Sequence, residues 1–208
     1  MVALLGLPWR TSSIACFTTA IESKPDYDDA YNNRGLAYKF KEDYDRAIAD
    51  FSKAIELKPQ EAGYYVNRGD TYRAKGLFDL AIEDQTKAIE LDPNLAAAYN
   101  GRCCAKAQAG LGQAAVADCD KAVQLAPDRP EVRESRGYAY LRLGNLQQAI
   151  ADFDKALSIY GEFPEALYER GVAKRRLGQA ASGDADIAAA RKLEPRIDEM
   201  MAKLGVTP

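Results

Sequence analysis

The chain has no histidine, and this absence narrows the chemistry that it can support. Without histidine it lacks the commonest general base at neutral pH and the Ser-His and Cys-His pairs of many nucleophilic enzymes. Acidic residues are plentiful but spread along the whole chain, and no glycine-rich phosphate loop follows a predicted strand. We therefore expect a protein without catalytic residues and without a cofactor.

Cysteine is scarce, with Cys16, Cys103, Cys104 and Cys119 as the four examples, and none stands in Cys-x-x-Cys spacing. Because no histidine can complete a ligand set, we expect no metal site. Cys103 and Cys119 fit most simply as small apolar core residues. A disulfide bond between them is the alternative, and it would imply an oxidising compartment.

Long apolar runs and a strong charge of either sign are also missing. The 208 residues are 47% hydrophobic, which is enough for a continuous core, and carry a formal net charge of −3. No stretch reaches the ~18 apolar residues of a membrane span. Residues Met1–Leu7 lack both the basic region and the hydrophobic length of a secretory signal. We expect no nucleic-acid partner, no membrane partner and a cytoplasmic location, unless a leader has been removed.

A proline recurs every 34 residues, and this period organises the chain. Gly161 takes the one slot in which proline is missing, between the last two members of the series Pro25, Pro59, Pro93, Pro127 and Pro195. A fixed period of this length is typical of stacked helical hairpins.

Small residues and aromatic residues recur with the same period. We number each period from its first residue, so that Asp28 is position 1 of the first. Position 8 has Gly35, Gly69, Cys103, Gly137 and Gly171; position 20 has Ala47, Ala81, Ala115, Ala149 and Gly183; position 27 has Ala54, Ala88, Ala122, Ala156 and Ala190. Tyrosine stands at position 4 as Tyr31, Tyr65 and Tyr99, and at position 11 as Tyr38, Tyr72 and Tyr140.

With these residues the chain resembles a tetratricopeptide repeat (TPR) array. The resemblance gives five full repeats, 28–61, 62–95, 96–129, 130–163 and 164–197. It implies an all-α fold, a right-handed α-solenoid of helical hairpins. Apolar residues at helical spacing predict helices from Asp28 to Lys41 and from Tyr44 to Leu57 in the first repeat. No segment alternates with a period of two, so we expect no strands; the turns are predicted at Gly76, Gly110, Gly144 and Gly178.

The N-terminal end departs from the period. Residues 1–27 are predicted to form an incomplete repeat, with a second helix from Ser13 to Pro25 and a first helix cut to Met1–Leu7. The second helix would carry a half-covered apolar stripe. We expect either that Met1–Leu7 covers this stripe or that the chain forms a homodimer through its N-terminal end. The residues of the stripe are Ile14, Phe17 and Ile21.

At the C-terminal end, residues 198–208 are predicted to form a capping helix. Ile197, Met201 and Leu204 repeat at helical spacing before Gly205. Solenoids need such caps, since a terminal repeat otherwise exposes its stacking face.

One charged pattern recurs in every full repeat. Position 7 is arginine (Arg34, Arg68, Arg102, Arg136, Arg170) and position 23 is aspartate (Asp50, Asp84, Asp118, Asp152, Asp186). In the TPR pattern position 7 is usually Leu, so each arginine should be largely buried and need a counter-charge. If each aspartate paired with the arginine of the next repeat, residue 16 would have to be an aspartate to pair with Arg34, but it is Cys16. We therefore predict pairs within repeats, sixteen residues apart. A row of arginines that binds an acidic ligand is the alternative.

The resemblance implies that the protein binds a protein or peptide segment in a concave groove formed by the first helices. Candidate binding residues at the groove positions are Asn33, Asn67, Asn100, Phe40, Asp70, Arg73, Tyr138, Arg142 and Tyr168. Asn33 and Asn67 stand at position 6, where an amide can both donate to and accept from an extended peptide backbone. Asn100 stands one residue before that position. The simpler interpretation is that asparagine merely tolerates an exposed helix.

Other functions remain as alternatives. TPR domains that clamp the carboxylate of a chaperone tail have a Lys at position 5 and an Asn or Arg at position 9, whereas Asn32, Leu36, Asn100 and Cys104 stand there. We therefore do not expect that partner. A homo-oligomeric scaffold is one alternative, and an RNA-binding helical repeat is another. The latter is disfavoured because such arrays repeat at about 35 residues and need a basic groove.

Overall fold

The computed structural model describes residues 9–208, and every element in this range is a helix. The predicted all-α fold is therefore confirmed. Two compact units make up the chain, Met1–Leu95 (unit 1) and Ala96–Pro208 (unit 2). The boundary falls between the second and third full repeats, where the uninterrupted period gave no sign of it. Among the described residues, no helix has the length and apolar character needed to cross a membrane.

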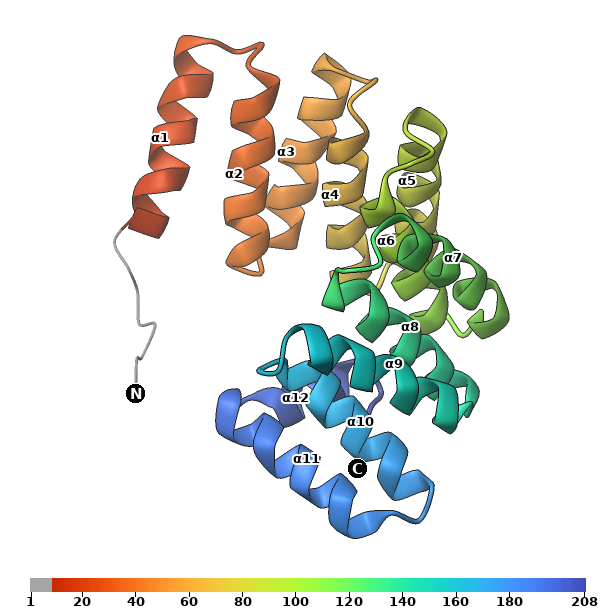
Figure 1. Ribbon diagram of the computed structural model, residues 1–208. Coiled ribbons are helices and arrows are strands. Elements are labelled where there is room, and N and C mark those ends of the chain that lie inside the picture. Colours follow the sequence, from red (N-terminus) through yellow and green to blue (C-terminus); the bar gives the residue numbers. More distant parts are fainter. Residues whose placement is uncertain (1–8) are drawn as a thin grey trace. The chain divides into compact units, whose positions relative to one another are not determined.

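Unit 1 contains α1 (Trp9–Ser23), α2 (Asp28–Phe40), α3 (Tyr44–Leu57), α4 (Ala62–Ala74) and α5 (Phe78–Leu91). Each helix packs against the next, and Figure 1 shows them side by side in chain order. The pairs α2–α3 and α4–α5 are the predicted hairpins of the first two repeats. The helix α1 stands in the place of the predicted second helix, but it covers Trp9–Ser23 where Ser13 to Pro25 was predicted. The expected first helix at Met1–Leu7 lies outside the described residues.

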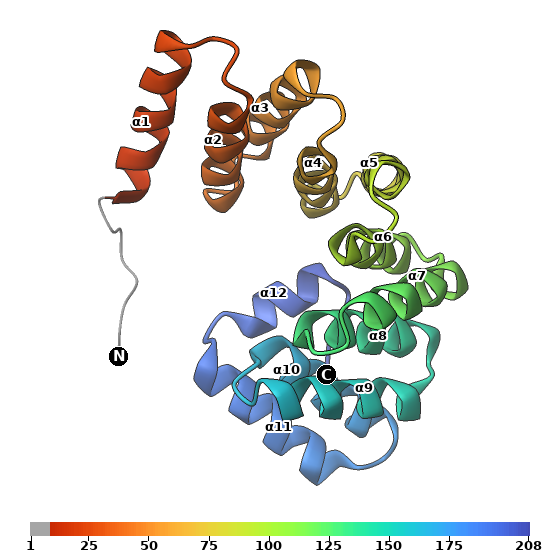
Figure 2. The same cartoon turned by 45° about the horizontal axis from the view of Figure 1, so that its top comes forward.

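Unit 2 contains three hairpins and one short helix. Its helices are α6 (Ala96–Gln108), α7 (Gly112–Leu125), α8 (Pro130–Leu143), α9 (Leu146–Ile159), α10 (Pro164–Arg176), α11 (Ala180–Leu193) and α12 (Ile197–Lys203). The hairpins are α6–α7, α8–α9 and α10–α11, and the short helix α12 packs against both α10 and α11 (Figure 2).

The turn inside each hairpin needs a left-handed residue. The predicted turn glycines Gly76, Gly110, Gly144 and Gly178 all have a φ between 78° and 82°. In the first repeat Glu42 takes the same place with a φ of 58°. Glycine adopts this conformation without a steric penalty, which explains why it ends the first helix in four of these repeats.

The small residues of the period lie where the two helices of a hairpin approach each other. A Cβ atom on Gly35 would come within 2.8 Å of the Phe51 ring, and one on Gly137 within 2.6 Å of the Phe153 ring. Both rings are fully buried. Position 8 must therefore be small wherever position 24 carries a phenylalanine, since such a contact would force the helices apart.

Candidate functional site

Each position-7 arginine forms a two-pronged ion pair with the position-23 aspartate of its own repeat. Nε and Nη2 donate to the two carboxylate oxygens over 2.7–2.9 Å in all five repeats. The arginine side chains are 17–20% exposed and those of the aspartates 6–12%. The predicted pairing within repeats, sixteen residues apart, is confirmed. Each guanidinium is already neutralised by a carboxylate, which speaks against a row of arginines that awaits an acidic ligand.

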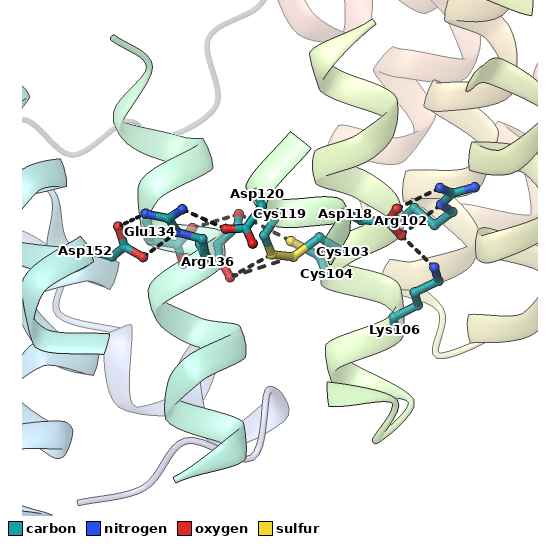
Figure 3. The surroundings of a disulfide bond; sticks show 11 residues. Arg102, Cys103, Cys104, Lys106, Asp118, Cys119, Asp120, Glu134, Arg136 and Asp152 are labelled. Carbon is teal, nitrogen blue, oxygen red and sulfur yellow. Dashed lines mark hydrogen bonds and ion pairs between the residues drawn. A yellow bond between two sulfur atoms is a disulfide. The ribbon is translucent and has the colours of Figure 1, made fainter. Parts of the chain in front are cut away.

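The third nitrogen of the guanidinium reaches the preceding hairpin, which the sequence interpretation missed. In unit 1, Arg34 Nη1 donates to Thr18 Oγ1 over 3.1 Å and Arg68 Nη1 to Ser52 Oγ over 2.9 Å. In unit 2, Asp120 accepts from Arg136 and Asp154 from Arg170 in the same way, over 2.8 and 2.7 Å. Figure 3 shows Arg136 between Asp120 and Asp152. The arginine thus ties two neighbouring hairpins together as well as the two helices of its own. The available signal was a polar residue sixteen positions before each of these arginines.

Position 11 supports the same pairs in two ways. In the second and fourth repeats it is a tyrosine whose ring lies beside the guanidinium, with Arg68 over Tyr72 at 5.8 Å and Arg136 over Tyr140 at 5.9 Å. Where it is lysine, the ammonium adds a second ion pair. Lys106 Nζ donates to Asp118 over 2.7 Å, and Lys174 Nζ donates to Asp186 over 2.8 Å.

The pKa shifts agree with a fixed charge on the guanidinium. Hydrogen bonds to Asp152, and less strongly to Asp120, hold the pKa of Arg136 above its ordinary value. Burial acts to raise the pKa of Asp186, but hydrogen bonds from Arg170 and Lys174 outweigh it and leave that pKa lowered. The pKa shifts of Arg170 and Asp186 therefore keep both members of this pair charged at neutral pH.

The candidate binding residues of unit 1 lie on α2 and α4. These are Asn33, Phe40, Asn67, Asp70 and Arg73, and together with Leu36 on α2 we call them the first-helix surface of unit 1. Asn33 is exposed, and so are Leu36 (39%) and Phe40 (63%). These three side chains are spaced along one face of α2 at i, i+3 and i+7.

Polar contacts join α2 to α4 beside that apolar row. Asn67 Nδ2 donates to Asn32 Oδ1 over 2.8 Å, so the amide nitrogen of this predicted binding residue already has a hydrogen-bond partner within the protein. Asp70 lies 3.7 Å from Lys39 Nζ and accepts from Gln85 Nε2 over 3.2 Å. The carbonyl oxygen of the Asn67 amide has no such bond to Asn32 and can accept from a ligand.

In unit 2 the candidate residues Tyr138, Arg142 and Tyr168 lie beneath the chain's own C-terminal segment. Tyr138 Oη donates to the carbonyl oxygen of Leu204 over 3.0 Å, and Arg142 Nη1 donates to the same oxygen over 2.9 Å. Tyr168 Oη donates to Asp198 Oδ1 over 2.9 Å. The two tyrosines are only 3% and 1% exposed, and burial is the main reason that the pKa of each rises to about 12. A C-terminal helix was predicted over residues 198–208, and the structure has α12 over Ile197–Lys203, followed by a segment that reaches α8.

Asn100, the third predicted binding amide, is half-buried on α6. Its Oδ1 is buried and accepts no hydrogen bond from the described residues. An amide in this position is not the freely exposed group that the sequence suggested, and it lies in unit 2 while Asn33 and Asn67 lie in unit 1. Whether these amides hold a peptide stays a prediction.

The comparison with known proteins agrees with the repeat geometry. Family models described as tetratricopeptide repeat match residues 28–61, 62–95 and 130–163, at the boundaries that the period predicts. The chain is a tetratricopeptide repeat protein. TPR repeats of this kind indicate a protein-interaction module. No curated protein sequence matches the chain.

Solved structures with the same fold include other TPR proteins. A crystal structure of the MamA protein is 25% identical, with a TM-score of 0.62 over 87% of this chain and 97% of that chain. TTC0263, a thermophilic TPR protein of Thermus thermophilus, is 19% identical, with a TM-score of 0.74 over 86% and 97%. YrrB, a TPR protein with an unusual peptide-binding site, is 22% identical, with a TM-score of 0.59 over 91% and 96%.

Two cysteines replace the usual glycine and phenylalanine in the third TPR repeat. Cys103 on α6 and Cys119 on α7 are fully buried and are joined by a disulfide bond, with their Cα atoms 5.3 Å apart (Figure 3). The structure therefore has the disulfide that was the alternative interpretation. Cys16 and Cys104 are not part of a disulfide. Among the residues that the structure describes, no group of three metal-ligating side chains lies close enough to hold an ion.

Glu169 is a buried acid that the sequence analysis did not single out. It lies on α10, is fully buried, and forms no ion pair with a lysine or arginine of the described residues. Burial, and next the charge of Glu134 on α8, raise its pKa well above the ordinary value. Cys104 on α6 and Glu165 on α10 also face it and act in the same direction. These surroundings therefore favour the protonated form of Glu169 in the folded protein.

We expect this proton to make stability fall as pH rises. A glutamate ionises near pH 4.3 in the unfolded chain and much higher here, so its stabilising contribution is complete below the unfolded pKa and is lost as pH rises through the folded pKa. The free energy of unfolding should decline over this range in the wild type and less steeply in Glu169→Gln. Urea denaturation at a series of pH values measures both slopes. The exposed Glu162→Gln is the control, and equal slopes for Glu169→Gln and wild type would contradict the assignment.

Proposed function

We propose that this TPR protein is a non-catalytic interaction module that binds an extended peptide or protein segment across the first-helix surface of unit 1. The observation that carries the proposal is the apolar row of Leu36 and Phe40, exposed on α2 beside the exposed amide of Asn33. Clusters of exposed apolar side chains with polar groups at their edge are common at protein-interaction surfaces. Asn33 and Asn67 supply amides for the main chain of the segment, and Leu36 and Phe40 supply contact area for one of its apolar side chains.

Replacing Asn33 and Asn67 together with Ala should weaken peptide binding about 5- to 150-fold. Each hydrogen bond contributes about 0.5–1.5 kcal/mol net, and 1.4 kcal/mol corresponds to a factor of ten. The ligand is a peptide selected from a random display library on the wild-type protein, and titration calorimetry measures its affinity. Asn94→Ala, at an exposed turn, is the matched control. We expect Asn100→Ala to have a separate and smaller effect, because its oxygen is buried.

Two outcomes would count against the proposed site. Unchanged affinity in the Asn33 and Asn67 double variant would move the ligand to another surface. If every selected peptide binds Phe40→Ala as tightly as the wild type, Leu36 and Phe40 are not part of the binding site.

A homo-oligomeric scaffold is the second candidate, and α1 favours it. Ile21 is buried, whereas Ile14 and Phe17 on the same helix are only half-buried. Partly exposed apolar side chains of this kind are often covered by association. We propose that two chains meet around a two-fold axis at α1.

This association should give a dimer at high micromolar concentration and a monomer after Phe17→Glu. The added carboxylate would be desolvated at the contact, which is unfavourable without a counter-charge. Light scattering coupled to gel filtration measures the mass of both chains. Ala15→Glu, at an exposed position of α1, should leave the dimer intact. A monomeric wild type at that concentration would rule out the association.

A further inference from the structure

The first-helix surface of unit 2 already holds a short helical segment, residues 197–206 of the same chain. We define this surface by Tyr138 and Arg142 on α8 and Tyr168 on α10. The buried side chains of Ile197 (0% exposed), Met201 (2%) and Val206 (1%) pack into one apolar cluster with both tyrosines. Three of the residues predicted from the sequence to bind a peptide are the ones that hold this resident segment.

Two polar contacts define what the surface recognises. At one end, Tyr138 Oη and Arg142 Nη1 both donate to the carbonyl oxygen of Leu204, just beyond the last residue of α12. The carbonyls at the C-terminus of a helix carry partial negative charge, so a cation there is favourable. At the other end, Asp198 accepts from Tyr168 Oη and forms a two-pronged pair with Arg191 over 2.8 Å.

These contacts require few specific residues in the bound segment. The bonds to Leu204 reach a main-chain atom, which any residue offers. The remaining requirements are a carboxylate in the first turn and apolar side chains one helical turn apart, here Ile197 and Met201. A segment of another protein that meets these requirements could make the same contacts.

The resident segment has little helical stability of its own. The helix α12 has seven residues, and isolated helices shorter than about 12–15 residues are marginal in water. Only Glu194, Pro195 and Arg196 connect it to α11. Its helical form therefore depends on the surface that holds it.

We propose that this surface is a binding site for a short amphipathic helix of a partner protein, and that residues 197–206 are an internal competitor that the partner displaces. The partner helix has apolar residues at i and i+4, a carboxylate at i+1, and its C-terminal carbonyls directed at Arg142. The inference rests on the proposed interaction function and adds a second surface with its own ligand chemistry. It does not depend on the first-helix surface of unit 1.

Competition can be measured with a fluorescently labelled peptide of residues 195–208 added to the full-length protein. Met201→Asp should release the resident segment and strengthen peptide binding at least 10-fold over the wild type, because occupancy by the internal competitor lowers the apparent affinity. Met200→Asp is the matched control, since Met200 is 37% exposed on the same helix and Met201 only 2%. Adding Arg142→Ala to Met201→Asp should lose most of the gain. Fluorescence anisotropy gives the affinities.

Several results would overturn the proposal. One is equal binding of the peptide to wild type and Met201→Asp, and another is binding that is indifferent to Arg142→Ala. Exchange of the segment between two wild-type chains, seen as a dimer that Met201→Asp abolishes, would assign the surface to a second copy in place of a partner.

Hydrogen exchange on the wild-type protein provides a second test that needs no variant to fold. Amides of residues 197–206, including the Val206 N–H that donates to the Met201 carbonyl, should exchange faster than those of α10. Equal protection of the segment and α10 would mean that the segment leaves only when unit 2 unfolds, and would sink the proposal. The Asn33 and Asn67 variants test unit 1 and do not change this result, so the two proposals can fail separately.

Discussion

Replacing Asp152 with Ala is expected to lower the free energy of unfolding by about 3 kcal/mol. Breaking a buried ion pair leaves an uncompensated charge and costs about 3–5 kcal/mol. The Asp152 side chain is 6% exposed and accepts from both Nε and Nη2 of Arg136. We expect the lower end of the range because Arg136 keeps its bond to Asp120. Chemical denaturation followed by circular dichroism measures the change.

The same arginine provides a matched control. Asp120 also bonds to Arg136, but its side chain is 54% exposed, so Asp120→Ala should cost no more than about 1 kcal/mol. Combining Asp152→Ala with Arg136→Leu should recover much of the loss, because the unpaired charge is removed and an apolar side chain takes its place. If Asp152→Ala is as stable as the wild type, the pairs are not structural.

The fold was predictable because each TPR hairpin is specified locally. A glycine at position 15 ends the first helix in four of the five full repeats. A small residue at position 8 lets the helices approach, and these signals recur without an insertion. The prediction placed helices at Asp28–Lys41 and Tyr44–Leu57, and α2 and α3 run over Asp28–Phe40 and Tyr44–Leu57. The division into two units was not predictable, because the period of the sequence continues across Leu95 unchanged.

The charged pairs were predictable for the same reason, since both partners recur at fixed positions. The acceptor for the third guanidinium nitrogen was not predicted, because the residue type at its position varies and only its polarity is kept. The acceptors are Thr18, Ser52, Asp120 and Asp154. The packing of the C-terminal segment on Tyr138 and Arg142 was not predictable either. It joins residues more than 60 positions apart that the repeat does not relate.

The disulfide in the third repeat should make stability depend on the redox state. Cys103 and Cys119 close a loop with a sequence separation of 16, and a loop of about 15 residues is worth about 3 kcal/mol of chain entropy in the unfolded state. A reductant should therefore lower the free energy of unfolding by about this amount. Chemical denaturation with and without reductant, together with a titration of free thiols, measures the effect. It also tests the predicted cytoplasmic location, since disulfides persist in oxidising compartments.

The other repeats supply a variant that removes the disulfide without leaving a cavity. Cys103→Gly with Cys119→Phe restores the combination found at Gly35 with Phe51 and at Gly137 with Phe153, where the ring fills the space over the glycine. This double variant should fold and lose its response to reductant, whereas Cys104→Ser should keep the response. A wild type with four titratable thiols and one denaturation curve under both conditions would show that Cys103 and Cys119 act only as small core residues. In that case the two substitutions compensate each other in volume. Cys119 is smaller than the phenylalanine found at position 24 of other repeats, and it leaves room for Cys103, which is larger than the glycine at position 8.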